Sequence, residues 1–239
     1  MPQTYVIIVA AGTGSRFGSD TPKQFLPMGH DRLPVVMHTI QAFRRYGIPL
    51  ENIFLILSEP MMSFWAELCE KHSFSSPKCI AGGSTRFQSV KNALTNLSCD
   101  SDARILIHDG VRPLVDSLTI AAVVEKLDVS SCVVPVVPET NSLRRLEADG
   151  SSQGVDRSLY RIVQTPQGFR ADLIKKAYQT EHKAEFTDDA SVAEAAGNQV
   201  QCVPGNVENI KITNSIDLKI AELLLSLHSA GPNCRPDNE

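Results

Sequence analysis

Aromatic residues are scarce in this 239-residue chain, where they make up 6% of the sequence and include a single tryptophan. Its six cysteines are scattered without a CxxC pair, and its histidines form no cluster at metal-ligand spacing. This pattern argues against a zinc site or a disulfide framework and indicates free thiols in a reducing cytoplasm. Since the chain also lacks a signal-peptide pattern and an apolar run long enough to cross a bilayer, we expect a cytoplasmic protein without a membrane partner.

The chain has no excess of positive charge either. Its net charge is -4 and its pI is about 5.9, so we do not expect a nucleic-acid backbone as a partner. Hydrophobic residues make up 42% of the sequence and charged residues 21%, which is ordinary for a globular protein able to bury a sizeable core. Any positive charge that binds a ligand must therefore be local.

Short apolar runs alternate with amphipathic stretches along most of the chain. We expect strands at 5–9, 53–57, 78–80, 105–108, 132–137, 200–203 and 210–212. We expect helices at 35–46, 64–72, 117–127, 171–180, 187–196 and 215–228, and one further helix that contains Val90 to Leu97. This alternation predicts an α/β fold with a mostly parallel sheet and helices on both faces.

Two of the expected helices carry more specific predictions. Thr187 is a plausible N-cap, and the following two aspartates suit a helix start. In the last helix we expect an inward face made of Ile216, Ile220, Leu223 and Leu224. No linker is visible, so we expect one domain over residues 1–230 and a disordered tail at 231–239.

The pattern changes between residues 138 and 165, where polar residues dominate around Gly150 and Gly154. A long irregular insertion in a compact domain usually has a function. We predict a protruding arm of two strands that closes near Asp149 and Gly150, a dipeptide typical of hairpin turns. An arm that cannot bury its own surface favours a homodimer, and a mobile surface loop is the alternative.

Three expected strands lead into loops that combine glycine with charged or hydroxyl residues, at 10–23, 81–89 and 109–112. In open parallel sheets, ligands bind at the carboxyl ends of the strands. Glycines let backbone N–H groups approach an anion closely, and Arg16 and Lys23 add positive charge to the first loop. The sequence therefore predicts a polyphosphate site at this edge.

A dinucleotide site fits this loop poorly. The third glycine of a GxGxxG motif would stand at position 17, where the chain has Phe17, and no acidic residue ends the second strand. A P-loop is also disfavoured, because no GK[ST] motif follows. The spacing of Arg16 and Lys23 suits a nucleoside triphosphate whose β- and γ-phosphates leave.

Together, the loops resemble a known family. The first segment, Ala10-Ala11-Gly12-x-Gly14-x-Arg16 with Pro22-Lys23-Gln24, is similar to the signature of sugar-nucleotide-type nucleotidyltransferases. The later segments are Gly82-Gly83-x-x-Arg86-x-x-Ser89, His108-Asp109-x-x-Arg112-Pro113, Val155-Asp156-Arg157, Gln164-Thr165-Pro166-Gln167, Thr187-Asp188-Asp189-Ala190-Ser191 and Asn209-Ile210-Lys211-Ile212-Thr213. In this order, over roughly residues 4–227, they resemble the 2-C-methyl-D-erythritol 4-phosphate cytidylyltransferase family of the non-mevalonate isoprenoid pathway.

The resemblance implies a single Rossmann-like nucleotidyltransferase domain that transfers CMP from CTP to methylerythritol phosphate and releases diphosphate. It assigns catalysis to Arg16, Lys23, Arg157 and Lys211. It places CTP against Ala10, Ala11, Gly12, Gly14, Gly82, Gly83 and Ser89. It places the acceptor against Asp109, Arg112, Ser142, Thr165 and Thr187, with Arg157, Thr187 and Lys211 on the acceptor phosphate. Mg²⁺ is the expected cofactor, bound mainly through the CTP phosphates, with Asp109 as a possible ligand.

Several positions carry further expectations. The family often has an acidic residue where this chain has Ser84, and commonly has threonine where it has Ser142. We expect Arg112 and Ser142 to come from the arm side, across a dimer interface. His108 is expected to pack at a strand end, because in-line attack by a phosphate needs no general base.

Two other functions stay open. A related cytidylyltransferase that uses ribitol 5-phosphate would share the chemistry and differ only in the acceptor pocket. A non-catalytic nucleotide-binding module would keep the sheet without turnover, although both loop cations, Arg16 and Lys23, are present. Diphosphate release from CTP with each polyol phosphate distinguishes these possibilities.

Overall fold

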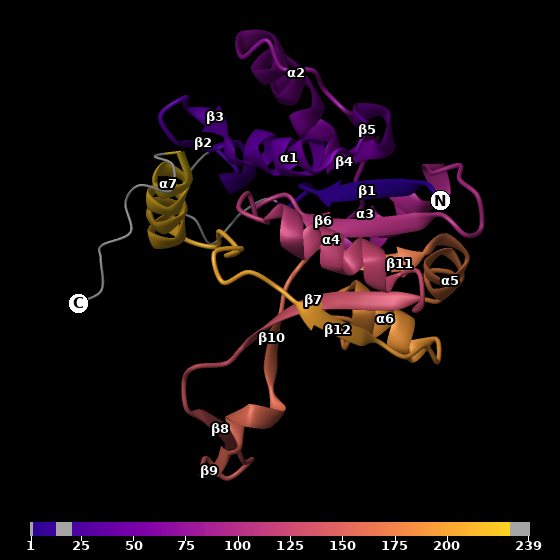
Figure 1. The fold of residues 1–239 in the computed structure, drawn as a ribbon, viewed down its shortest axis with the longest axis vertical. Coiled ribbons are helices and arrows are strands. Elements are labelled where there is room, and N and C mark those ends of the chain that lie inside the picture. Colours follow the sequence, from indigo (N-terminus) through magenta and orange to yellow (C-terminus); the bar gives the residue numbers. More distant parts are fainter. Residues whose placement is uncertain (1, 13–20, 230–239) are drawn as a thin grey trace.

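The computed structural model describes residues 2–12 and 21–229. The predictions for Gly14, Arg16 and the tail at 231–239 therefore lie outside the described residues. Within them, the chain forms a central sheet, flanking helices and an arm that projects away from the sheet (Figure 1).

The eight-stranded central sheet follows the order β10-β7-β11-β6-β1-β4-β5, and β12 pairs with β7. Its strands are β1 (Thr4–Val9), β4 (Ile53–Leu57), β5 (Lys78–Ala81), β6 (Arg104–Asp109), β7 (Cys132–Pro138), β10 (Arg161–Val163), β11 (Gln167–Arg170) and β12 (Gln201–Pro204). The pairs β1–β4, β1–β6, β4–β5 and β7–β12 are parallel, whereas β10 and β11 run antiparallel to their neighbours. The predicted mostly parallel sheet is confirmed.

Helices cover both faces of this sheet. On one face lie α1 (Val35–Tyr46), α2 (Met62–Lys71) and α4 (Ser117–Lys126), and on the other α3 (Arg86–Asn96), α5 (Ala171–Ala177) and α6 (Asp189–Ala195). Successive side chains of a strand point to opposite faces, so Val6 and Ile8 of β1 join the first core and Ile7 joins the second. Burial on both sides explains why these strands read as continuous apolar runs.

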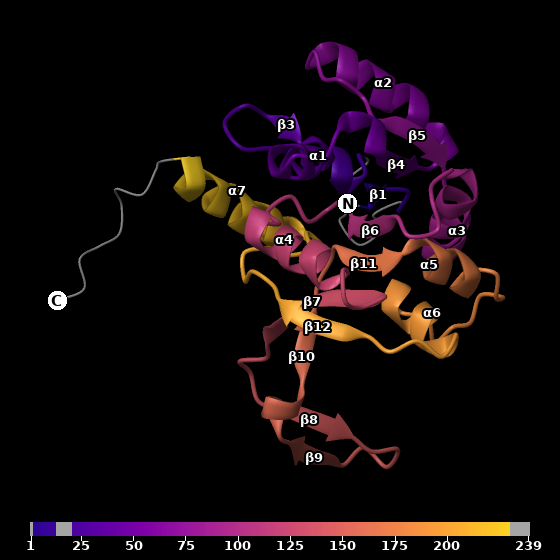
Figure 2. The same ribbon diagram turned by 45° about the vertical axis from the view of Figure 1, so that its right-hand side comes forward.

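The arm is a hairpin of β8 (Leu143–Leu146) and β9 (Ser152–Val155), which pair antiparallel. Its turn contains Asp149 and Gly150, and the glycine adopts a left-handed φ of 84°. This confirms the predicted hairpin, and the two ribbon views agree that it projects beyond the sheet (Figure 2). The predicted arm extends too far, because β10 pairs with β7 inside the sheet.

Three further predictions about the elements are wrong or incomplete. Residues 210–212 form no strand, and Ile212 donates one backbone hydrogen bond to Val111. The antiparallel strand β11 was not expected. The N-cap of α6 is Asp188 rather than Thr187, because the Asp188 carboxylate accepts from the N–H of Ser191, whose hydroxyl accepts from the N–H of Asp188.

The last helix, α7 (Ser215–Ser229), turns a different face inward from the one predicted. Ala221 is buried, and Leu218, Leu224 and Leu225 pack beside it against a small cluster that includes Met28. The predicted inward residues Ile216, Ile220 and Leu223 are exposed, while Leu224 is correctly placed. Apolar residues occur on several sides of α7, so periodicity alone does not determine the buried side. The two short strands β2 (Pro27–Met28) and β3 (Leu33–Pro34) lie near this cluster.

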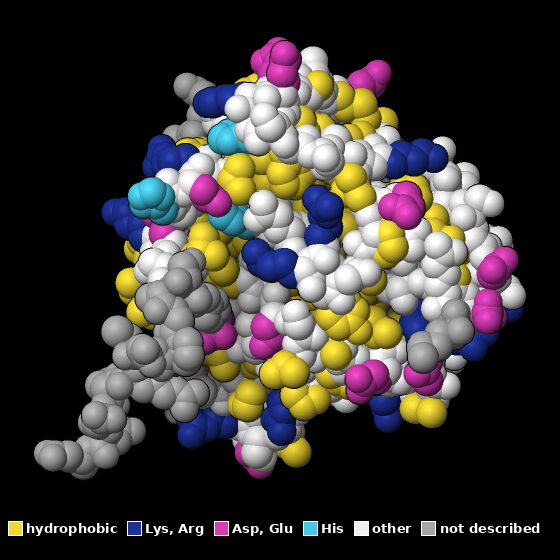
Figure 3. Space-filling view, turned by 45° about the horizontal axis from the view of Figure 1, so that its top comes forward, with side chains coloured by type: hydrophobic (Ala, Val, Ile, Leu, Met, Phe, Trp, Pro, Cys, Tyr) yellow, Lys and Arg dark blue, Asp and Glu magenta, His cyan; other side chains and the backbone are white. Residues whose placement is uncertain are grey.

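The surface carries charges of both signs. On the face in Figure 3, lysine and arginine side chains are interspersed with acidic ones and with small apolar areas. A search of the described residues finds no helix with the length and apolarity needed to span a membrane.

Candidate active site

A cavity of about 480 Å³ lies at the carboxyl ends of β1, β5 and β6, where the three predicted loops meet. Its walls include the predicted nucleotide residues Ala10, Ala11, Gly12, Lys23, Gly83 and Ser89. This is the edge at which an open parallel sheet binds ligands, because the loops after neighbouring strands converge there. We refer to it as the nucleotide cavity.

Close packing between two loops shapes the nucleotide cavity. A Cβ atom added to Gly82 would lie 2.7 Å from the Cβ of Ala11, so only glycine lets the two loops approach this closely. The N–H of Gly83 donates to the hydroxyl of Ser89 at 3.0 Å, and that hydroxyl lies 2.8 Å from the carbonyl oxygen of Thr85, to which it donates. Gly82 and Ser89 therefore set the shape of the loop.

Gln24 organises the first loop, a role that the sequence analysis did not assign. Its side chain is buried, and its Nε2 donates to the carbonyl oxygens of Ala10 at 2.8 Å and Gly12 at 2.9 Å. These bonds join the end of β1 to the 3₁₀ turn Lys23–Phe25. Lys23, the first residue of that turn, is thereby brought into the wall of the nucleotide cavity.

A second cavity of about 230 Å³ adjoins the first and shares Arg86, Asp109 and Lys211 with it. Its walls also include Arg112, Thr165, Thr187 and Asp188. The structure thus brings together five of the predicted acceptor residues: Asp109, Arg112, Thr165, Thr187 and Lys211. We refer to it as the acceptor cavity.

Asp109, the last residue of β6, is the electrostatic centre of the two cavities. Its Oδ2 lies 3.1 Å from Lys211 Nζ and 3.2 Å from Arg112 Nε, and its Oδ1 lies 3.7 Å from Arg86 Nε. Burial alone would raise the pKa of Asp109, but the charges of Arg86, Lys211 and Arg112 outweigh it and hold the pKa well below its ordinary value. Asp109 is therefore ionised at neutral pH.

The family model for 2-C-methyl-D-erythritol 4-phosphate cytidylyltransferase matches residues 4–227, nearly the whole described chain. The chain belongs to this family. The enzyme of that name from Bacteroides thetaiotaomicron is 48% identical over 221 residues, which cover 92% of this chain and 98% of that protein. The one from Bacillus cereus is 37% identical over 226 residues, covering 92% of this chain and 96% of that protein.

Solved structures of cytidylyltransferases agree with the fold. The crystal structure of 2-C-methyl-D-erythritol 4-phosphate cytidylyltransferase from Thermus thermophilus superimposes with a TM-score of 0.70 at 29% identity, covering 92% of this chain and 98% of that one. The 4-diphosphocytidyl-2C-methyl-D-erythritol synthase from Anaerococcus prevotii superimposes with a TM-score of 0.77 at 25% identity, covering 94% and 99%. The α/β nucleotidyltransferase-like fold is therefore shared.

His108 supports the site from behind, as predicted for a packing residue. It is fully buried, and its ring packs edge-on against Phe43 at 4.9 Å. Its Nε2 donates to the carbonyl oxygen of Arg112 at 3.0 Å, so its Nδ1 accepts from the hydroxyl of Thr165 at 2.9 Å. Burial lowers the pKa of His108 to about 4, so the ring is neutral at neutral pH.

Thr165 and Arg112 also hold the backbone around Asp109. The hydroxyl of Thr165 accepts from the N–H of Asp109 at 3.1 Å. Arg112 donates to Asp109 and, at 2.8 Å, to the carbonyl oxygen of Asn209. Arg112 follows β6 and lines the cavity of its own chain, so the expectation that it comes from the arm side is wrong. In this cytidylyltransferase it links Asp109 to the segment that carries Lys211.

Two predicted residues lie away from both cavities. Ser142 and Arg157 are exposed on the arm, and neither is in the wall of the nucleotide or the acceptor cavity. Arg157 donates to the carbonyl oxygen of Thr140, also on the arm. Any role of Ser142 or Arg157 in cytidylyl transfer therefore requires the arm to reach a site other than the one in its own chain.

The sequence analysis missed the partners of Arg86 in the shared wall, the buried side chains of Tyr178 and Asp189. Arg86 belongs to the Gly82-Gly83-x-x-Arg86 motif, but this motif gives no indication of an ion-pair partner 103 positions away in the sequence. Asp189 is adjacent to Asp188 in the sequence, and only the fold shows that Asp189 is the buried one of the two.

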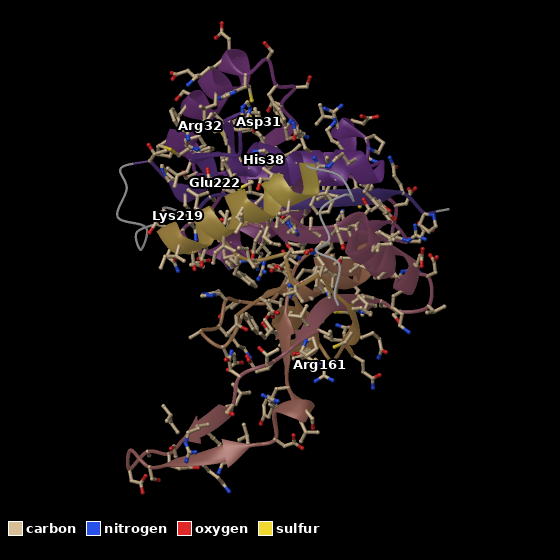
Figure 4. All side chains as sticks on the ribbon, turned by 60° about the vertical axis from the view of Figure 1, so that its left-hand side comes forward. Asp31, Arg32, His38, Arg161, Lys219 and Glu222 are labelled. Atoms are coloured by element: carbon tan, nitrogen blue, oxygen red, sulfur yellow. The ribbon has the colours of Figure 1, made fainter. Side chains whose placement is uncertain are left out.

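A separate cavity of about 530 Å³ lies between the β2–β3 hairpin, α1 and α7. Its walls include Asp31, His38 and Glu222, and Figure 4 shows Asp31 and His38 next to α7, with Glu222 on that helix. The ring of His38 is buried and its Nε2 contacts the carbonyl oxygen of Met28 at 3.0 Å. None of the predicted cytidylyltransferase residues lines this cavity, so it is distinct from the candidate active site.

Proposed function

We propose that this protein transfers CMP from CTP to 2-C-methyl-D-erythritol 4-phosphate, forming CDP-methylerythritol and diphosphate. The observation that carries the proposal is the pair of adjoining cavities, which share Arg86, Asp109 and Lys211 at the carboxyl edge of the sheet. One cavity suits a nucleoside triphosphate and the other a phosphorylated polyol. Membership of the family supports the choice of both substrates.

In this reaction an oxygen of the acceptor phosphate attacks the α-phosphorus of CTP in line with the leaving diphosphate. A new phosphorus–oxygen bond forms to the acceptor, and the bond between the α-phosphorus and the bridging oxygen breaks, so its electron pair leaves with diphosphate. Charge builds on the α-phosphoryl oxygens and on diphosphate, and fixed cations stabilise it. We assign this stabilisation to Lys23 in the wall of the nucleotide cavity and to Arg16 in the same loop.

The small residues of the nucleotide cavity suit a pyrimidine. Ala10, Ala11 and Gly83 leave room for a small ring, and their backbone groups can pair with the amine and carbonyl of cytosine. Ser84 is exposed in the wall of this cavity, where the family often has an acidic side chain. Cytosine recognition through backbone atoms would be unaffected by this serine.

The acceptor cavity offers donors for a phosphate dianion. Lys211 contributes an ammonium group, and Thr187 contributes a hydroxyl group at the exposed end of the segment before α6. Charge-assisted hydrogen bonds of this kind are the strong ones for phosphate. We assign Lys211 and Thr187 to the acceptor phosphate, and Asp109 to the acceptor hydroxyls.

We propose Mg²⁺ as the cofactor, bound mainly through the CTP phosphates. Among the described residues there is no group of three or more histidine, cysteine or acidic side chains that could hold a metal ion. Asp109 is the ionised carboxylate in the walls of both cavities, and cationic side chains already contact both of its oxygens. This donor set fits an ion that arrives with the nucleotide, and such an ion neutralises phosphate charge.

We also infer a cytoplasmic location, supported by the state of the thiols. Cys69, Cys79, Cys99, Cys132 and Cys202 are free. Burial raises the pKa of Cys69 to about 11 and that of Cys132 to about 12, so these two thiols stay protonated. Unpaired thiols are typical of proteins from a reducing compartment.

We further propose a homodimer in which the arm of one copy reaches the acceptor cavity of the other. Arg157 and Ser142 stand on the arm and line neither cavity of their own chain. The arm also exposes Leu146 at 78% and Leu159 at 80%, apolar surface that a second copy would cover. Arg157 of the second copy would then join Lys211 and Thr187 on the acceptor phosphate.

Mixing two inactive variants tests the exchanged arm. In this dimer, the pair formed by an Arg157→Ala chain and a Lys211→Met chain contains one intact site and one site with both defects. Each variant alone is expected to be nearly inactive, and a co-expressed equal mixture is expected to recover about a quarter of wild-type turnover, since half of the dimers are mixed. A mixture no more active than the separate variants would show that Arg157 does not act across the dimer.

An acceptor panel tests the proposed function itself. Diphosphate release from CTP is measured with methylerythritol 4-phosphate and with ribitol 5-phosphate, each in the presence of Mg²⁺. We expect turnover with methylerythritol 4-phosphate and far less with ribitol 5-phosphate. The reverse preference would identify a ribitol-phosphate enzyme, and CTP binding without any release would identify a non-catalytic module.

A further inference from the structure

Arg86 lies in the shared wall of the two cavities and forms a two-point ion pair with Asp189. Arg86 Nη1 lies 2.8 Å from Asp189 Oδ1, and Nη2 lies 2.6 Å from Oδ2. Arg86 opens α3 directly after the loop of the nucleotide cavity, and Asp189 opens α6 directly after the Thr187 segment of the acceptor cavity. The pair therefore joins the two halves of the reaction site.

Tyr178 completes this group from the end of α5. Its hydroxyl donates to Asp189 Oδ1 at 2.6 Å, and its ring stacks on Phe87 at 4.8 Å between centroids. Asp189 is fully buried, and an ionised carboxylate in that position is tolerated only where cations and donors compensate its charge. Arg86 and Tyr178 supply that compensation, so the orientation of the guanidinium group is tightly determined.

The remaining edge of the guanidinium faces the reaction site. With Nη1 and Nη2 directed at Asp189, Arg86 Nε lies 3.7 Å from Asp109 Oδ1. The other oxygen of Asp109 receives Lys211 and Arg112, at 3.1 and 3.2 Å. Arg86 thus lies beside the oxygen of Asp109 that Lys211 and Arg112 leave free of contact.

The side chain of Lys211 is held by Asp109. Its side chain is 43% exposed, and a lysine is a point charge on a flexible stem. The segment around it forms no strand, although the next residue, Ile212, is buried and its N–H donates to the carbonyl oxygen of Val111. Its bond to Asp109 gives the ammonium group a defined position beside the acceptor cavity.

We propose that Arg86 is a positioning residue, held by Asp189 and Tyr178, which orients Asp109 and through it places Lys211 for the acceptor phosphate. This inference rests on the proposed function and adds a residue group to it. Because the group acts through Asp109 and Lys211, we expect its loss to weaken use of the acceptor more than binding of CTP.

The test compares Arg86→Lys and Tyr178→Phe with the wild-type protein. Lysine keeps the positive charge but cannot contact both oxygens of Asp189 and still face Asp109, and phenylalanine keeps the stacked ring without the hydroxyl. For Arg86→Lys we expect the KM for methylerythritol 4-phosphate to rise about tenfold and kcat to fall about tenfold, with the Kd for CTP within about twofold. Tyr178→Phe is expected to change the same constants by about threefold.

Arg104→Lys is the matched control. Arg104 is a buried arginine at the first position of β6, the strand that ends at Asp109, and it pairs with Asp128 away from both cavities. Its loss is expected to lower thermal stability while the kinetic constants of the folded enzyme stay unchanged. A merely structural role of Arg86 would give the same result as this control.

The results distinguish the positioning role of Arg86 from the proposed cytidylyl transfer. A selective change in the acceptor KM and kcat of Arg86→Lys supports the positioning role, and Tyr178→Phe provides the same readout if Arg86→Lys does not fold. Unchanged constants, or equal losses for CTP and acceptor, overturn that role while an active wild type leaves the proposed function standing. A wild-type protein that releases no diphosphate with any acceptor overturns the proposed function, and the positioning role with it.

Discussion

Replacing Lys211 by methionine is expected to lower kcat/KM for methylerythritol 4-phosphate by about 10²–10³-fold. Methionine keeps most of the length of the stem and removes the ammonium group that lies 3.1 Å from Asp109, in the walls of both cavities. The attacking phosphate then loses a cation that both binds and aims it. Steady-state kinetics with varied acceptor measure the loss, and calorimetric titration measures CTP binding separately.

CTP binding is expected to change little in Lys211→Met, because Lys23 and the glycine loops remain in the nucleotide cavity. The fold is also expected to persist, since Asp109 keeps Arg86 and Arg112 as partners. The matched control is Lys219→Met, which removes an exposed lysine from α7 (Figure 4) and should leave turnover unchanged. If Lys211→Met retained acceptor use close to that of the control, Lys211 would have no part in the reaction.

Replacing Lys23 by methionine is expected to lower kcat by a similar factor, about 10²–10³, for a different reason. Lys23 lies in the nucleotide cavity on the 3₁₀ turn that Gln24 ties to the end of β1. Its charge is expected to interact more strongly with the departing diphosphate than with bound CTP, because negative charge grows there in the transition state. The decrease should therefore appear mainly in kcat, measured as diphosphate release at saturating substrates.

Two comparisons make the Lys23 result specific. Lys23→Arg keeps a positive charge at the turn and should recover part of the lost turnover, whereas Lys71→Met removes an exposed charge at the end of α2 and should have no effect. A Lys23→Met enzyme that differs only in its KM for CTP would mean that Lys23 binds the ground state and transition state equally.

Much of the fold could be predicted because its signals are local. The apolar runs of β1 and β4 are buried on both faces, and this environment leaves a continuous hydrophobic pattern in the sequence. The hairpin turn at Asp149 and Gly150 follows from two residues that tolerate left-handed backbone. The loops after β1, β5 and β6 could be placed together because parallel strands end at one edge.

Predictions failed where neighbouring elements decide the outcome. The strand β11 was missed because its four residues begin with a glutamine and a glycine and owe their pairing to β6 and β7. The predicted inward face of α7 is wrong because apolar side chains occur on several sides of the helix. Contact with the Met28 cluster selects the side around Ala221. Thr187 was preferred as a cap because the sequence shows three adjacent candidates, and backbone geometry selects Asp188.

By itself, the sequence determined the class of fold, the edge at which ligands bind and the residue types that meet there. These follow from hydrophobic periodicity and from glycine, which act within a few residues of chain. Only the tertiary structure decided that Arg86 pairs with Asp189 across 103 positions and that Asp109 is shared by Lys211, Arg112 and Arg86. The tertiary structure also placed Arg157 outside both cavities of its own chain. Such pairings depend on which charged side chains become buried next to each other when the helices pack on the sheet, and no local sequence pattern encodes this.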